Sequence, residues 1–94
     1  MNLYLLSQYE QRGLDTYSSM VVAAEDKRAA KQITPESFCK YIKGKLHRLD
    51  ENEKWVEDDG SGWATKQTNV EVELLGTAVP GTKRGIILVS FHAG

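Results

Sequence analysis

The sequence is poor in several features that would restrict where the protein works. Its one cysteine, Cys39, cannot form an internal disulfide, which fits a reducing compartment. No apolar run approaches the roughly 20 residues that span a bilayer. The first 13 residues lack the basic start and the long apolar stretch of a signal peptide. The sequence therefore predicts a soluble, cytoplasmic protein with no membrane partner.

An excess of positive charge is also lacking. Twelve lysine and arginine residues face thirteen aspartate and glutamate residues, for a formal net charge of −1. Proteins that bind nucleic acid through its phosphates need surplus positive charge, so direct nucleic-acid binding is not expected. A length of 94 residues provides one hydrophobic core but not two. We therefore expect a single domain over residues 1–94.

Four segments have the patterns of β-strands. Val70–Leu75 alternates apolar and acidic residues, which is typical of a strand with one buried and one solvated face. Gly85–Phe91 is apolar on both faces, as a strand in the middle of a sheet would be. Pro80-Gly81 lies between them and predicts a turn, so we expect an antiparallel hairpin. Shorter strands are predicted at Asn2–Ser7 and Met20–Ala24.

The middle of the chain predicts two helices. Asp26 is a good N-cap for a first short helix, and Thr34-Pro35 has the pattern of a second helix start. Apolar residues then recur at steps of three and four up to Leu49: Phe38, Tyr41, Ile42, Leu46 and Leu49. The predicted fold is α+β, a four-stranded antiparallel sheet with two helices packed on one face, in the order β-β-α-α-β-β. Its predicted core contains Leu5, Val22, Ile42, Leu74, Ile87 and Val89.

No catalytic or metal-binding pattern is evident. Cys39, His47 and His92 are too scattered to form a metal site. Cys39 would lie at the start of the second predicted helix, where amide dipoles favour a thiolate, but no histidine partner accompanies it. Residues 58–62 lack the lysine of a phosphate-binding loop and the ligand spacing of a calcium loop. We therefore expect no enzyme activity, no cofactor and no metal.

Both ends of the chain resemble a family of small proteins from bacteriophages, prophages and their hosts, to which no activity is assigned. The similar stretches are Met1–Ser7, Gly13–Tyr17, Val21–Glu25, Glu73–Ala78 and Gly85–Gly94. Residues 38–53 look like an insertion relative to that family. The resemblance implies a small accessory protein of a phage or mobile element, acting in the host cytoplasm.

Two functional hypotheses follow. The first is a protein that binds and covers a host protein surface, such as an anti-CRISPR inhibitor that counters host defence. Its contacts are predicted on the charged segment 36–63, at Lys40, Lys43, Lys45, Arg48, Trp55, Glu57 and Asp58. The alternative is a nucleotide-binding protein that grips a base and a phosphate with Asp15, Tyr17, Trp63 and Arg84. An apolar sheet edge also makes a homodimer possible.

Overall fold

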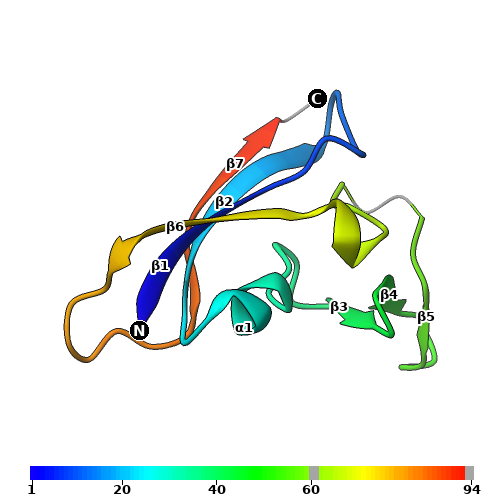
Figure 1. Cartoon of the computed structure of the whole chain (residues 1–94). Coiled ribbons are helices and arrows are strands. Elements are labelled where there is room, and N and C mark those ends of the chain that lie inside the picture. The colour runs from blue at the N-terminus through cyan, green and yellow to red at the C-terminus, as the bar shows by residue number, and fades with distance from the viewer. Residues whose placement is uncertain (60–61, 93–94) are drawn as a thin grey trace.

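The computed structural model describes residues 1–59 and 62–92, and its largest element is a four-stranded antiparallel sheet, called the main sheet below (Figure 1). Its strands are β1 (Asn2–Ser7), β2 (Thr16–Ala24), β6 (Glu71–Thr77) and β7 (Gly85–His92). They lie in the order β6-β1-β2-β7. The two N-terminal strands are therefore central, and the two C-terminal strands are the edges.

The central strands have one face in the core. Tyr4 and Leu6 of β1 lie opposite Val22 and Met20 of β2, and all four side chains are buried. Because side chains alternate along a strand, the neighbours of these residues point to the opposite side. Leu5, for example, is only partly buried there. We call the buried side the inner face of the main sheet and the other its outer face.

The alternation predicted for residues 70–75 is confirmed by the pairing of β6 with β1. Val72 and Leu74 lie opposite Leu6 and Tyr4 and so share the inner face, whereas Glu71 and Glu73 belong to the outer face. A bulge shifts the register beside Leu74. The alternation was readable because it depends on local pattern alone.

The predicted hairpin between the two C-terminal strands is wrong. The turn itself forms, because both the backbone N–H and the hydroxyl of Thr82 donate to the Val79 carbonyl, and Gly81 has a φ of 90°. The chain that follows, however, joins the far edge of the main sheet beside β2. Gly85–His92 is thus an edge strand and not a central one.

This placement also corrects most of the predicted core. Val22 is buried as expected, and Leu5 and Ile42 are half-buried. Leu74, Ile87 and Val89 are exposed because they lie on the two edge strands. Hydrophobic pattern selects strands, but it does not say which strand takes the centre of a sheet.

A second, smaller antiparallel sheet lies beside the helix at residues 27–31, on the inner side of the main sheet (Figure 1). It consists of β3 (Cys39–Ile42), β4 (Lys45–Leu49) and β5 (Trp55–Glu57), in that order. We call it the small sheet. A 3-10 turn, η1 (Gln67–Asn69), leads from it to β6.

The helix predicted over residues 36–49 is wrong, because this segment forms the β3–β4 hairpin. Lys43 and Gly44 have φ values of 51° and 79° and connect two paired strands as a two-residue loop. Positive φ at both loop residues defines the turn whose twist suits a hairpin. Thr34 is not a helix cap, since its hydroxyl donates to the carbonyls of Glu36 and Cys39 in a turn.

The predicted fold class is therefore also wrong. The described residues form seven strands in two antiparallel sheets, with one short α-helix and one 3-10 turn, so the protein is mostly β. In place of two packed helices, the short helix that follows β2 packs against the main sheet, and the small sheet completes the core beside it. None of the helices formed by residues 1–59 and 62–92 has the length and apolar character needed to cross a membrane.

The first predicted helix is present as α1 (Lys27–Lys31). The Asp26 carboxylate accepts the Ala29 N–H at 2.7 Å and caps its first turn, as expected. Ala30 is fully buried and anchors the helix to the core, while Lys27 and Arg28 are exposed. A helix this short is stable only through such packing.

The core lies between the two sheets and α1. Its buried members come from β1, β2, α1, β3, β4 and the segment from Trp63 to Val70, and Trp63 is its largest fully buried side chain. Tyr41 from β3 donates its hydroxyl to the Ala64 carbonyl at 2.6 Å, which ties the small sheet to the segment that carries Trp63. Burial is the largest cause that raises the pKa of Tyr41, so this phenol stays neutral and able to donate.

The loop between β1 and β2 is tied down by two side chains. Gln8 is buried and bonds the backbone of Gln11 and Tyr17. Glu10 reaches the segment after Trp63, where it accepts from the backbone and hydroxyl of Thr65 and from the Asn69 amide. These bonds connect chain segments that are 55 and 59 residues apart.

The first prediction concerns the Lys43-Gly44 turn. Gly44→Ala should lower the free energy of unfolding by about 1–2 kcal/mol, because a Cβ at positive φ is strained even where space is open. Gly76→Ala is the matched control, since Gly76 also has open space but no positive φ. Equal urea unfolding midpoints for the two variants would contradict the turn geometry.

The second prediction concerns Glu10. Burial raises its pKa, but hydrogen bonds from Thr65, Asn69 and the Lys66 backbone together bring it below the ordinary value of 4.5. A carboxylate with a lowered folded pKa stabilises the fold above its unfolded pKa, and that stabilisation is lost as pH falls through the folded pKa. The stability deficit of Glu10→Gln should thus be largest near neutral pH and shrink below about pH 4. Chemical unfolding across this range measures it.

Glu51→Gln, in the exposed turn between β4 and β5, is the matched control. It should leave the free energy of unfolding nearly unchanged at every pH. A Glu10→Gln deficit that stays constant down to the acid limit would show that the carboxylate charge does not hold the loop.

Candidate functional site

The small sheet presents one face to the core and one to the surroundings. Cys39, Tyr41 and Leu46 are buried and point inward. The residues that alternate with them along the strands point away from the main sheet. We call this side the exposed face of the small sheet, and strand alternation and register assign to it Lys40, Ile42, Lys45, His47, Leu49, Trp55 and Glu57.

An apolar row crosses the exposed face at one end. Leu49 lies opposite Trp55, and its N–H donates to the Phe38 carbonyl at 3.1 Å, which extends the β3–β4 pairing by one residue. Leu49 and Trp55 are therefore neighbours across the strands, and Phe38 lies in the turn beside Leu49; each of the three is more than one-third exposed. Large apolar side chains that remain accessible together in this way mark a surface suited to protein contact.

Charged side chains adjoin the apolar row. Lys40, His47 and Glu57 lie opposite one another on successive strands. The Lys40 ammonium lies 4.2 Å from the centre of the Trp55 ring, within the range of a cation–π contact. This contact orients the indole while leaving 36% of the residue accessible.

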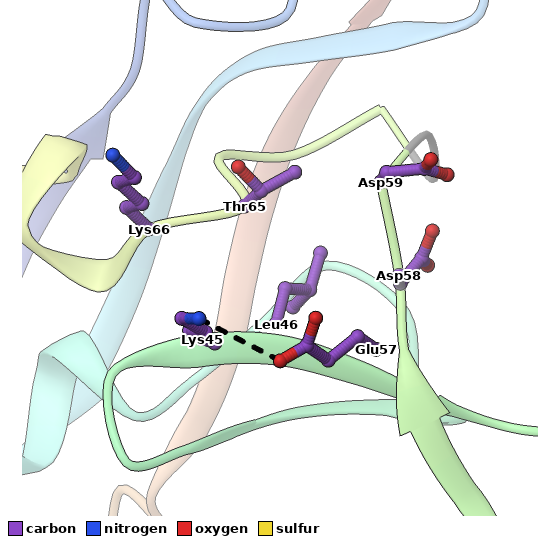
Figure 2. Close-up of a pocket in the computed structure, with 7 residues that line it drawn as sticks. All are labelled: Lys45, Leu46, Glu57, Asp58, Asp59, Thr65 and Lys66. Atoms are coloured by element: carbon purple, nitrogen blue, oxygen red, sulfur yellow. Dashed lines mark ion pairs between the residues drawn. The ribbon is translucent and has the colours of Figure 1, made fainter.

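An open cavity of about 400 Å³ lies where the small sheet meets the segment after Trp63. Figure 2 shows its lining residues: Lys45, Leu46, Glu57, Asp58, Asp59, Thr65 and Lys66. The Lys45 ammonium and the Glu57 carboxylate are 3.7 Å apart, and both side chains are mostly exposed. An exposed pair of this kind contributes little to stability, so both groups remain available to a ligand.

Four of the seven residues predicted for partner binding come together on the exposed face: Lys40, Lys45, Trp55 and Glu57. Lys43 lies in the turn at the end of this face. Arg48 alternates to the other side but stays exposed, and Asp58 is buried beside the Cys39 sulfur at 3.7 Å. Phe38, His47 and Leu49 are not among the predicted contacts. The helix predicted over residues 36–49 places Phe38 and Leu49 on its buried side.

The alternative ligand-binding residues do not form one site. Asp15, Tyr17 and Trp63 lie on adjoining segments, because the Tyr17 N–H donates to the Gly62 carbonyl. Arg84 instead pairs with Glu25 at 2.6 Å, beyond the opposite end of β7. The seven steps from Gly85 to His92 separate the two ends by about 23 Å.

The side chains in this alternative region are also engaged. Trp63 is only 1% exposed, so its ring cannot stack on a base. The Tyr17 hydroxyl donates to Glu36 at 2.5 Å, and this hydrogen bond is the main cause that raises the pKa of Tyr17 to about 12. A phenol held by a carboxylate is not free to bind phosphate.

Cys39 is in a strand and not at a helix start, so the helix-dipole activation considered from the sequence does not apply to it. Within residues 1–59 and 62–92, no three histidine, cysteine, aspartate or glutamate side chains gather as metal ligands would. The exposed face combines aromatic and aliphatic surface with charges of both signs.

Comparison with protein-family models, with curated proteins and with solved structures finds no match to this chain.

The third prediction separates the two tryptophans. Trp63→Ala should lower the free energy of unfolding by about 3–5 kcal/mol, because it empties a fully buried site. Trp55→Ala should cost under about 1 kcal/mol, since it removes a side chain from the surface. Chemical denaturation of both variants provides the measurement. A large loss from Trp55→Ala would mean that the indole holds the small sheet together and is not free for contact.

Proposed function

We propose that the chain acts by binding another protein and covering part of its surface, and that the exposed face of the small sheet makes the contact. The observation that supports this most directly is the exposed row Phe38, Leu49 and Trp55 beside the charged row Lys40, His47 and Glu57. Protein interfaces combine an apolar, aromatic centre with a polar rim in the same way.

Trp55 is the main anchor in this proposal. Tryptophan is among the residues whose truncation weakens protein complexes most. Here the Lys40 contact holds the indole in place before binding, so less side-chain freedom is lost when a partner covers it. Leu49 extends the apolar area on the same row, and the exposed Phe38 lies beside it in the turn before β3.

The charges define the partner's chemistry. Lys40 and Lys45 are basic, whereas Glu57 and Asp59 at the adjoining cavity are acidic. A nucleic-acid phosphate backbone would be attracted by the first pair and repelled by the second. A protein surface can match both, with an apolar pocket for Trp55 flanked by acidic and basic groups.

The resemblance to phage-associated proteins extends the proposal to the biological setting. The partner would be a host protein, and covering its surface would inhibit it, as a counter-defence factor of the anti-CRISPR kind does. The exposed face falls largely within residues 38–53, the segment that departs from that family. A chain-specific partner is therefore expected at this segment.

The fourth prediction tests this surface. Immobilised protein should capture a stoichiometric protein partner from lysates of candidate host bacteria. Trp55→Ala and Lys40→Glu should each weaken capture by about tenfold or more, in line with loss of an interface anchor. Quantitative pull-down with mass spectrometry, at matched bait density, provides the measurement.

Lys83→Glu is the matched control, because it reverses an exposed lysine in the β6–β7 loop, away from the small sheet. It should capture as much partner as the unchanged protein, and all variants should remain folded, with melting temperatures within about 8 °C of the unchanged protein. Equal capture by all four proteins would place the contact elsewhere. Nucleotide binding by calorimetry with no protein captured would favour the alternative function.

A further inference from the structure

β7 is an edge strand whose one bulge, at Ile87, leaves residues 88–92 regular and without the usual protection against pairing. It is the last strand of the main sheet and pairs with β2. Five of its eight residues are large, apolar and between 37% and 66% exposed: Ile86, Ile87, Leu88, Val89 and Phe91. Proteins usually blunt such an edge with lysine, proline or inward-pointing charge. Gly85–His92 contains none of these residues.

The strand is apolar toward both faces of the sheet. Leu88 lies opposite Val21 on the outer face, whereas Val89 lies opposite Met20 on the inner face. Phe91 packs against the Tyr17 ring with centroids 4.6 Å apart, yet 45% of it stays exposed. The apolar surface of both faces therefore continues to the rim of the sheet at β7, where the next strand would lie.

We propose that β7 pairs antiparallel with β7 of a second copy of this chain, across a two-fold axis, so that two main sheets become one continuous sheet. Each copy would gain backbone hydrogen bonds along the edge and would cover the exposed side chains of the other. This surface is separate from the exposed face of the small sheet and does not depend on the proposed function.

A second copy is favoured over another partner by the charge pattern. A two-fold axis brings a strand against an identical strand, so a strand with a net charge would meet the same net charge. Gly85–His92 carries no formal charge and meets that condition. The opposite edge does not, because β6 carries Glu71 and Glu73 on its outer face.

The alternation of side chains limits the register. Residues directly opposite each other must point to the same face, which requires the axis to pass through a residue and not between two. An axis at Val89 places Leu88 opposite Ser90 of the copy, both on the outer face. Because the bulge at Ile87 breaks the alternation, regular pairing about this axis covers residues 88–90, and residues 91 and 92 meet the bulged end of the other strand. So short a contact lies below most specific interfaces and predicts a dissociation constant on the order of 100 micromolar.

The fifth prediction is the oligomeric state. Sedimentation velocity from about 1 to about 200 μM should show the 10.5 kDa chain shifting toward twice that mass. Leu88→Lys should raise the dissociation constant by at least about tenfold, because it places the edge-protecting residue on the pairing strand. Val79→Lys is the matched control, because Val79 is more exposed than Leu88 but lies in the loop before β7. This variant should dimerise as the unchanged protein does.

Cross-linking tests the register. Val89→Cys should form a covalent dimer under mild oxidation, since directly opposed residues of antiparallel strands lie about 4.5–5.5 Å apart at Cα. Val79→Cys should form far less, and the native Cys39 is buried. Trp55→Ala should dimerise normally, which separates this interface from the proposed partner-binding face.

Three results would overturn the proposal. One is an unchanged protein that sediments as a monomer over the whole concentration range. Another is a dimer that persists equally in Leu88→Lys and Ile87→Lys, both with unchanged circular dichroism. The third is equal cross-linking of Val79→Cys and Val89→Cys, which would indicate random collision.

Discussion

The burial of Trp63 between the two sheets is the interaction on which the rest of the structure depends. Its side chain fills the space where the inner face of the main sheet meets the small sheet. The preceding residue, Gly62, has a φ of 84°, and a Cβ there would lie 2.7 Å from the Asp15 carbonyl oxygen. Only glycine permits this approach, so the segment can cross close to the start of β2 and deliver the indole to the core.

This arrangement explains how a chain of 94 residues supports two sheets. The small sheet is too small to be stable alone, because sheets of few short strands need a packed face. Leu46 and Tyr41 form that face, and they pack in one buried cluster with the large side chain of Trp63. The residues of the exposed face are then less constrained by stability, because the packing that stabilises the small sheet lies on its opposite side.

The sequence allowed much of the main sheet to be predicted but little of its order. Asn2–Ser7 was read correctly as a strand, because its short apolar run is local information. Which strands occupy the centre depends on long-range pairing. The apolar composition of residues 85–91 predicts a central strand, whereas the segment forms an edge. The prediction of a second helix is wrong for a different reason. Apolar residues three and four apart also fit two short strands joined by a tight turn, and the Lys43-Gly44 pair was the signal that could have distinguished them.

The candidate site was foreseen in part. Lysines and Trp55 were selected by residue type, and four of the seven selected residues do share one face, although the reason was a predicted helix that is not there. The contribution of Phe38 and Leu49 could not be foreseen, because their exposure follows from strand register. The proposed nucleotide grip combined residues at both ends of β7, and only three-dimensional structure reveals such a separation.

The unequal edges of the main sheet have a consequence for how far assembly can proceed. A sheet with two adhesive edges can add copies at both ends and grow into a fibre. Here one edge is neutral and apolar, whereas the other carries two glutamates. In the proposed dimer, both outer margins of the joined sheet would be acidic and would repel further copies. Pairing through the neutral edge would then stop at two copies, and the long apolar strand over residues 85–92 need not make the protein prone to aggregation.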